Sequence, residues 1–313
     1  MIALMLVGGF GLLVLGGEGL VRGAATLALR AGLSPLLVGL TVVGFGTSLP
    51  ELLTSVEASF ANAPGIAIGN VVGSNIANIL LILGVAALIR PVPVGRAGFR
   101  RDGFAVVLAT ALGVAICLLG EIGRLAGLVL LAGLCLYLYI AWRGERSDPE
   151  AEAEDDLPGE KSGSPWLALV YLLLGFAAML AGAKMLVFGA IDLARGLGVS
   201  EAVIGLTVVA IGTSLPELVT SVVAAIRKHS DIAFGNVLGS NIFNILGILG
   251  ATAVIAPLRA PDEILDLDVW VMSAATLGLI FVAVTSWKIT RFEGGLMVGA
   301  YLVYLGYLAI GAA

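Results

Sequence analysis

The chain alternates long apolar runs with short polar breaks. Ten runs are each about 20 residues or longer, which is the length that a helix needs to cross the hydrocarbon core of a bilayer. The predicted spans are 2–30, 35–61, 65–89, 102–120, 123–143, 166–196, 201–227, 231–256, 266–288 and 291–312. The first run has no basic residue before it and is longer than the apolar part of a signal peptide, so we expect it to be retained as a span.

Composition agrees with this pattern. Hydrophobic residues make up 59% of the 313 positions and charged residues 12%, which is too much apolar surface for a water-soluble globule to bury. The runs are also too long for the alternating strands of a membrane barrel. The sequence therefore predicts an all-α, multi-pass integral membrane protein in contact with the lipid bilayer, and its net charge of −5 gives no reason to expect nucleic acid.

Several kinds of catalytic and metal centre are excluded by the side chains available. Cys117 and Cys135 lie inside apolar runs without CxxC spacing, and His229, the single histidine, lies at the end of a run. A zinc site, a redox pair and a Cys/His nucleophile are therefore not expected. We expect no resident cofactor and no enzymatic activity.

One polar stretch divides the chain. Residues 144–165, GERSDPEAEAEDDLPGEKSGSP, carry 8 of the 22 carboxylates together with Pro, Gly and Ser, a composition typical of a disordered connector. The stretch lacks the spaced ligands and the turn glycine of an EF-hand calcium loop. We expect a solvated linker between two units, 1–143 and 166–313.

The two units repeat each other at an offset of 166 residues. Residues 39–55 match 205–221 at 14 of 17 positions, and residues 69–84 match 235–250 at 13 of 16. Five spans in each unit is an odd number, so the second unit enters the membrane from the opposite side. The sequence therefore predicts two inverted five-helix repeats, with repeat motifs at 39–84 and 205–250.

Basic residues indicate the orientation. With both termini outside, 13 of the 17 lysines and arginines fall in cytoplasmic loops or at the adjoining helix ends. This bias places the 144–165 linker in the cytoplasm.

The stretch GTSLPEL occurs twice, at Gly46–Leu52 and Gly212–Leu218. Proline has no N–H and its ring clashes with the carbonyl four residues back, so Pro50 and Pro216 should break their helices and leave the Gly46 and Gly212 carbonyls free. Such carbonyls are tolerated at membrane depth only around a protein-lined cavity. We expect two broken helices that meet at the membrane midplane.

Each motif also carries oxygen-bearing side chains on one helix face. Pairs four residues apart are Thr47 and Glu51, Ser74 and Asn78, Thr213 and Glu217, and Ser240 and Asn244. An ionised carboxylate near the midplane costs roughly 2.5–3.5 kcal/mol or more, and no lysine or arginine lies at similar depth in these runs. A hard cation fits two carboxylates among neutral oxygens, and the charge of Ca²⁺ matches two glutamates.

At these residues the sequence resembles the sodium/calcium exchangers of the calcium/cation antiporter superfamily, in the prokaryotic type without a large regulatory domain. The family motifs GTSLPE and GNxxGSNxxN stand at Gly46–Glu51 with Gly69–Asn78, and at Gly212–Glu217 with Gly235–Asn244. The resemblance implies calcium/sodium antiport by alternating access in a prokaryotic cell membrane, with cations bound between the repeats.

The resemblance also implies roles for individual residues. Glu51 and Glu217 would be shared calcium and sodium ligands, supported by Thr47 and Thr213. The flanking sodium positions would use the hydroxyls of Ser48, Ser74, Ser214 and Ser240 and the carbonyls of Gly44 and Ala210. Asn78 and Asn244 would line the centre. Many relatives carry aspartate where this chain has Asn244, and this difference argues against coupling to potassium.

Motion is implied in the same way. The first and sixth helices would slide across this core, and closely spaced glycines would allow them to pack closely. These glycines are Gly8, Gly9, Gly11, Gly16, Gly17, Gly19 and Gly23.

Other functions remain open at this point. A proton/calcium antiporter of the same superfamily is the main alternative, because burial favours the protonated form of a carboxyl group. A calcium channel is disfavoured by the two-fold repeat, and an intramembrane hydrolase acting through Ser48 or Ser214 lacks a suitable base. The two prolines could also be simple kinks, although kinks do not require matched Glu, Thr and Asn in both units. The sequence leaves the stoichiometry and oligomeric state open.

The remaining charges are assigned to structure. We expect Glu18 to pair with Arg22 four residues on, and Lys184, its counterpart in the repeat, to reach toward the interface or a local partner. Acids at the ends of the runs are expected to be solvated caps; these are Asp102, Glu121, Asp262, Glu263, Asp266 and Asp268.

Overall fold

The computed structural model describes residues 2–31, 33–61, 63–145, 164–196 and 210–311. Nearly all of the described chain is helical, and four strands of two residues each join the helix ends. Most of the predicted linker, at 146–163, and the first part of the predicted span 201–227 lie outside the described residues. The protein is an all-α protein, as expected.

The first half contains six runs of helix, of which the second and third, on either side of Ser48, make up one predicted span. Its elements are α1 (Ile2–Ala31), α2 (Pro35–Val38), the π-helix η1 (Gly39–Val43), α3 (Gly44–Thr47), α4 (Leu49–Phe60), α5 (Pro64–Ala77), the π-helix η2 (Asn78–Leu83), α6 (Gly84–Ile89), β1 (Val92–Pro93), α7 (Arg96–Leu118), β2 (Glu121–Ile122) and α8 (Arg124–Glu145). Helices α2 to α3 and α5 to α6 are continuous runs, each containing a π-helical segment.

The described elements of the second half follow a similar order, with an additional π-helix, η7, before α15. They are α9 (Pro165–Gly196), α11 (Ala210–Thr213), α12 (Leu215–Ile226), α13 (Ser230–Ile242), the π-helix η6 (Phe243–Leu249), α14 (Gly250–Ile255), β3 (Leu258–Arg259), the π-helix η7 (Ile264–Asp268), α15 (Val269–Ser286), β4 (Lys288–Ile289) and α16 (Arg291–Gly311). Helices α4 and α12, α6 and α14, and strands β1 and β3 recur at the offset found in the sequence.

Helices of membrane-spanning length account for most of the molecule. Seven helices in the described residues are long and apolar enough to cross a bilayer, and the pair Leu36–Thr47 and Leu49–Phe60, bent by 40°, makes an eighth if it is one span. These eight coincide with eight of the ten predicted spans. Helix α16 covers the range of the tenth prediction, and α11 with α12 covers the described part of the seventh.

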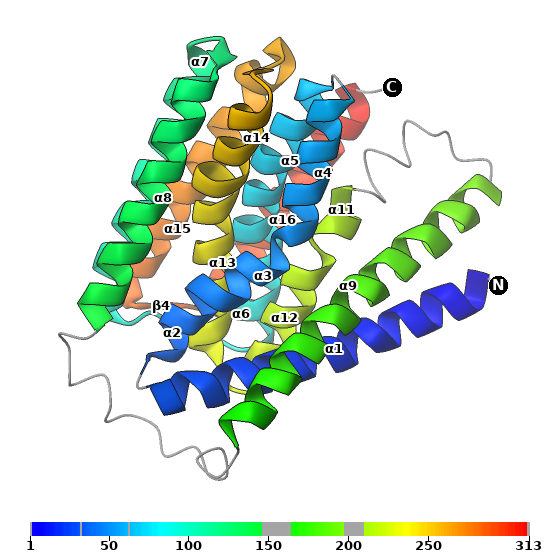
Figure 1. Ribbon diagram of the computed structural model, residues 1–313, viewed down its shortest axis with the longest axis vertical. Helices are drawn as coiled ribbons and strands as arrows, with labels where there is room; N and C mark the ends of the chain where they lie inside the picture. Colours follow the sequence, from blue (N-terminus) through cyan, green and yellow to red (C-terminus); the bar gives the residue numbers. More distant parts are fainter. Residues whose placement is uncertain (1, 32, 62, 146–163, 197–209, 312–313) are drawn as a thin grey trace.

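Helices α1 and α9 lie side by side and cross the rest of the bundle at an angle (Figure 1). Glycines spaced by seven residues on α1 face small residues of α9, and an added Cβ at Gly9, Gly16 or Gly23 would lie 2.6–2.8 Å from a carbonyl oxygen of α9. The two backbones therefore touch, as the glycine spacing predicted. Gly11 differs, because a Cβ added there would have no neighbouring atom within 4 Å.

Two strand pairs tie the remaining helices together. Strand β1 pairs with β4, and β2 pairs with β3, both antiparallel. Because β1 and β2 flank α7 while β3 and β4 flank η7–α15, these two helical segments run antiparallel and are joined at both ends. The larger apolar core spreads over this part of the molecule, and a separate core cluster holds α1 and α9 against α12 and α13.

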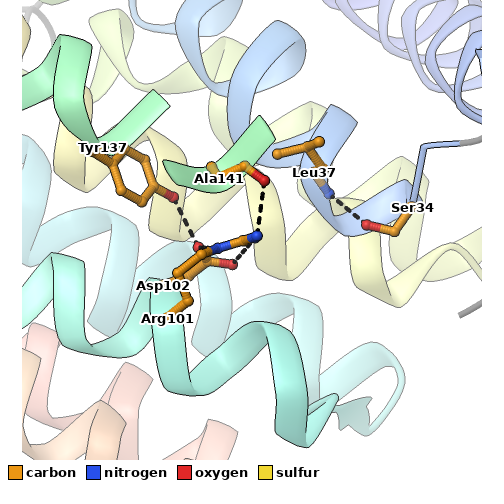
Figure 2. A network of polar contacts seen from close by, with 6 residues as sticks. All are labelled: Ser34, Leu37, Arg101, Asp102, Tyr137 and Ala141. Carbon is orange, nitrogen blue, oxygen red and sulfur yellow. Dashed lines mark hydrogen bonds and ion pairs between the residues drawn. The ribbon is translucent and has the colours of Figure 1, made fainter. Parts of the chain in front are cut away.

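The prediction for Asp102 is wrong. Asp102 was expected to be a solvated cap, but it is fully buried because α8 covers the start of α7 (Figure 2). Arg101 Nε lies 2.7 Å from Asp102 Oδ1, and the Tyr137 hydroxyl donates to the same oxygen at 3.2 Å. Arg101 also donates to the Ala141 carbonyl at 2.9 Å. The buried Asp102 carboxylate is therefore paired with a charged group, Arg101, and hydrogen-bonded to Tyr137.

The other charges follow the predictions more closely. Glu18 pairs with Arg22 as expected, and it also accepts a hydrogen bond from Arg227 at the end of α12 at 2.8 Å. Lys184 Nζ lies 6.0 Å from the centre of the Phe188 ring. Asp268 is half-buried and accepts a hydrogen bond from Tyr304 at 2.8 Å, so it is not a solvated cap. The other predicted caps are exposed; they are Glu121, Asp262, Glu263 and Asp266.

Candidate functional site

The two GTSLPEL motifs form helix breaks at Ser48 and Ser214. Both serines have almost the same backbone angles, φ −84° and ψ 6° at Ser48 and φ −88° and ψ 6° at Ser214. Pro50 and Pro216 fall in the first turn of α4 and α12, where a missing N–H removes no helical hydrogen bond. The motif therefore ends one helix and starts the next, and each glutamate lies in the first turn of the second helix.

The backbone at the first break differs from the prediction in one respect. Its N–H groups donate to the carbonyls of Gly44 and Gly46, so the Gly46 carbonyl is not left free. The last turn of the helix is tightened, so that the Gly46 carbonyl accepts a backbone hydrogen bond. Many helices end in this way. The matching expectation for Gly212 stays a prediction.

The two breaks face each other through crossed side-chain contacts. The Ser48 hydroxyl donates to Glu217 Oε1 at 3.1 Å, and the Ser214 hydroxyl donates to Glu51 Oε1 at 3.3 Å. Both glutamates are 1% exposed. Residues 163 to 169 positions apart in sequence thus form one cluster, with a carboxylate and a hydroxyl from each repeat motif.

The helices that carry the GSN motifs pack against the helices that carry the glutamates, η6 against α4 and η2 against α12. Asn78 is the first residue of the π-helix η2, and Asn244 lies in the π-helix η6. π-Helices are rare in proteins as a whole, but those that occur are often found at functional sites. Both side chains are 1% exposed. Gly239 allows α13 to lie against the backbone of Leu40, since a Cβ there would overlap the Leu40 carbonyl. The second GSN helix is thereby held against the first broken helix.

Four oxygens on the two glutamates and on Asn78 and Asn244 lack a partner. Glu51 Oε2, Glu217 Oε2, Asn78 Oδ1 and Asn244 Oδ1 are buried and accept no hydrogen bond from any described residue. Neither glutamate forms an ion pair with a lysine or arginine in the described part of the chain. Buried carboxylates without partners are costly, so their missing partner is expected to be a cation.

The donor set favours a hard cation. All four unpartnered atoms are oxygens, which suit Ca²⁺ and other hard ions. Among the described residues, no group of three or more His, Cys, Asp and Glu side chains comes together. Softer metals prefer nitrogen or sulfur ligands and would find none in this cluster.

The other predicted threonines and serines are buried or half-buried. The Thr47 hydroxyl lies 3.0 Å from the Val43 carbonyl and 3.1 Å from Asn236 Oδ1. The Ser240 hydroxyl donates to the Gly44 carbonyl at 3.3 Å, so these two predicted residues meet across the repeats. Ser74 is buried, and Thr213 is half-buried and has an interaction partner.

Little can be said about the contacts of Ala210. It is the first residue of α11, and the residues before it lie outside the described ranges. Its carbonyl therefore remains a predicted ligand only.

Four asparagines were missed by the sequence reasoning. Asn70 Nδ2 donates to the Glu51 carbonyl at 3.0 Å, and Asn236 Nδ2 donates to the Glu217 carbonyl at 3.4 Å. Asn75 and Asn241 accept hydrogen bonds from the side-chain amides of Asn244 and Asn78. The signal was available, because GN and GSN are identical in both motif copies. Each residue is hydrogen-bonded to the backbone of a glutamate or to the side chain of Asn78 or Asn244.

Comparisons with known proteins agree with this arrangement. A family model for the sodium/calcium exchanger protein matches residues 1–143 and 167–310. The putative antiporter CaxA of Alkalimonas amylolytica is 37% identical over 304 residues, covering 95% of both chains. The sodium/calcium exchanger MaX1 of Methanosarcina acetivorans is 36% identical over 338 residues, covering 96% of this chain and 97% of that protein.

Solved structures of the sodium-calcium exchanger NCX_Mj have the same fold. The structure soaked with 2.5 mM Na⁺ and 10 mM Sr²⁺ matches with a TM-score of 0.86 at 35% identity, covering 98% of this chain and 99% of that one. The structure soaked with 2.5 mM Na⁺ and 0.1 mM Ca²⁺ matches with a TM-score of 0.85 at 33% identity and 97% coverage of both chains. The chain is therefore an integral, multi-pass membrane protein that belongs to the sodium/calcium exchanger family.

Proposed function

We propose that this protein exchanges calcium for sodium across the membrane by alternating access. The observation that carries the proposal is the group of four buried, unpartnered oxygens on Glu51, Glu217, Asn78 and Asn244. Two carboxylates match the charge of one Ca²⁺, and the neutral amide oxygens add coordination without adding charge. The names of MaX1 and NCX_Mj, and the ions soaked into NCX_Mj, support the same pair of cargoes.

The neighbouring hydroxyls and carbonyls support sodium as the exchanged ion. Neutral oxygens beside the carboxylates serve as sodium ligands and are unnecessary for a proton. In this proposal Glu51 and Glu217 bind both ions with the help of Thr47 and Thr213, and Asn78 and Asn244 line the centre. The flanking sodium positions are formed by Ser48, Ser74, Ser214, Ser240 and the carbonyls of Gly44 and Ala210.

The architecture in this proposal has ten helices in two inverted repeats. The recurrence of elements at the sequence offset supports it, as do the crossed contacts between Ser48 and Glu217 and between Ser214 and Glu51. The cations bind at the midplane, between the broken helices of the two repeats. Helices α1 and α9 move across this core as a closely packed pair.

The grouping of basic residues supports an orientation with both termini outside. Arg90, Arg96, Lys288 and Arg291 all lie beside the β1–β4 pair, while Arg124 and Arg259 lie beside the β2–β3 pair at the other end of α7. The end with more basic residues faces the cytoplasm by the positive-inside rule. The 144–165 linker is then cytoplasmic.

Electrostatics explains why the protein exchanges ions and does not release calcium alone. An empty site would carry two uncompensated carboxylates in a region of low dielectric, and the penalty for each is several kcal/mol. A transition between the two access states is therefore slow when the site is empty. It becomes fast when calcium or sodium neutralises the site.

Transport in proteoliposomes tests the proposal. We expect an outward sodium gradient to drive calcium uptake with the pH gradient collapsed and without potassium. Protein-free vesicles provide the background. Calcium uptake that is driven by a pH gradient in sodium-free medium, and that sodium does not affect, would show that the chain is a proton/calcium antiporter.

A further inference from the structure

Two crossed asparagine pairs connect the GSN segments of the two repeats. Asn244 Nδ2 donates to Asn75 Oδ1 at 3.1 Å, and Asn78 Nδ2 donates to Asn241 Oδ1 at 3.5 Å. All four side chains are 1% exposed. In each pair, one asparagine gives its NH₂ group and the other gives its carbonyl oxygen.

The two pairs determine which side-chain atom of Asn78 and Asn244, the oxygen or the NH₂ group, is left without a hydrogen-bond partner. An asparagine side chain carries an acceptor oxygen at one end and a donor NH₂ group at the other. In Asn78 and Asn244 the NH₂ group is bound by the partner asparagine, and the oxygen is the atom left without a partner. A flipped amide would present its NH₂ hydrogens in place of the oxygen, and these hydrogens would repel a cation.

We propose that Asn75 and Asn241 are positioning residues, which hold the oxygens of Asn244 and Asn78 available to the transported cation. This inference rests on the proposed function of the same site. It assigns no ion contact to Asn75 or Asn241. Their oxygens act on the cation only through the amides that they orient.

The two pairs are not equally strong. Asn75 is held by a second contact, because its NH₂ group lies 3.6 Å from the Met272 sulfur on α15. The NH₂ group of Asn241 is buried and has no hydrogen-bond partner among the described residues. With its longer contact to Asn78, Asn241 should orient its amide less firmly than Asn75 does.

Calcium titration of the purified full-length protein by calorimetry tests this inference without a counter-ion. We expect Asn75→Ala to weaken calcium binding on the order of fivefold, which corresponds to the loss of one net hydrogen bond of about 1 kcal/mol. Asn241→Ala should weaken binding by a smaller factor, about two- to threefold. Thermal unfolding without calcium reports any general loss of stability.

Coupling between variants separates positioning from a structural role. A carboxylate at position 244 presents an oxygen in either orientation, so Asn75→Ala should cost no affinity in the Asn244→Asp background. Asn241→Ala should keep its effect there, because it acts on Asn78. Losses that are equal in both backgrounds would overturn the proposal in favour of a structural role.

The result for the wild-type protein distinguishes the two levels of the argument. Calcium binding by the wild type, with unchanged affinity in both single variants, would overturn the positioning role and leave the proposed function intact. Absence of calcium binding by the wild type would overturn the proposed function and this inference together.

Discussion

Replacement of Gly16 by alanine tests the contact between α1 and α9. An added Cβ would lie 2.6 Å from the Gly175 carbonyl oxygen and 2.7 Å from the Met179 nitrogen. Both are backbone atoms, so no side-chain rotation can relieve the overlap. Non-bonded atoms in contact are about 3.5 Å apart, so the two helices would have to separate locally by about 1 Å.

The cost of this separation can be estimated from packing. An extra methyl group in a well-packed interface typically costs about 1–3 kcal/mol, and a gap of about 0.5–1 Å removes a quarter to a half of the dispersion energy of each neighbouring atom pair. Gly9 and Gly23 make the same close approach on either side, so α1 has little freedom to tilt away. We expect Gly16→Ala to lower the free energy of unfolding by about 1–3 kcal/mol.

Gly11→Ala is the matched control. It makes the same chemical change on the same helix, at a position with no neighbouring atom within 4 Å. This variant should be as stable as the wild type, or slightly more stable, because alanine favours helix over glycine by up to about 1 kcal/mol.

Thermal unfolding in detergent and sodium-driven calcium uptake should be measured on the same preparations. The Gly16 variant should unfold at a lower temperature and transport more slowly, since α1 and α9 are proposed to move together. Equal unfolding temperatures for the Gly16 and Gly11 variants would refute the close backbone contact.

Three further predictions concern single side chains. Glu51→Gln and Glu217→Gln should each abolish calcium uptake, because the one remaining carboxylate only half neutralises Ca²⁺. The control Glu57→Gln, at an exposed position on α4, should transport calcium normally. Uptake at the wild-type rate in the Glu51 and Glu217 variants would contradict the site. A cysteine at Glu121, introduced without the two native cysteines, should react with an impermeant reagent outside intact cells, and labelling only after lysis would reverse the orientation. Asp102→Asn should cost about 3 kcal/mol of stability by removing the buried charge that pairs with Arg101, and the calcium affinity of the folded fraction should not change; a stable variant with weakened binding would contradict this structural role.

The sequence was sufficient to find both helix breaks, because the doubled GTSLPEL motif located them. The spacing of four residues predicts that Thr47 lies near Glu51 and that Thr213 lies near Glu217. These are local features, which follow from proline geometry and helical periodicity. The contacts of Ser48 with Glu217 and of Ser214 with Glu51 fit the expectation that the motifs converge.

Features that depend on packing between distant segments could not be predicted. Asp102 looked like a solvated cap because its neighbours in sequence are basic and lie at the end of an apolar run. It is buried by Tyr137 and Ala141, about forty residues later on another helix. The pairing of Asn75 with Asn244 likewise depends on how two GSN helices meet. The π-helical segments have no sequence signal comparable to proline.

The strand pairs at the two ends of α7 and η7–α15 restrict which part of the molecule can shift along its axis. Each pair is only two residues long, but one lies at either end of the same two antiparallel segments. A displacement of α7 past α15 by one helical turn, about 5.4 Å, would therefore break backbone hydrogen bonds at both ends at once. In the described residues α1 and α9 take part in no strand pair. The sheet contacts thus resist axial displacement of α7 past α15, whereas no strand pair of this kind opposes the displacement that the proposed mechanism assigns to α1 and α9.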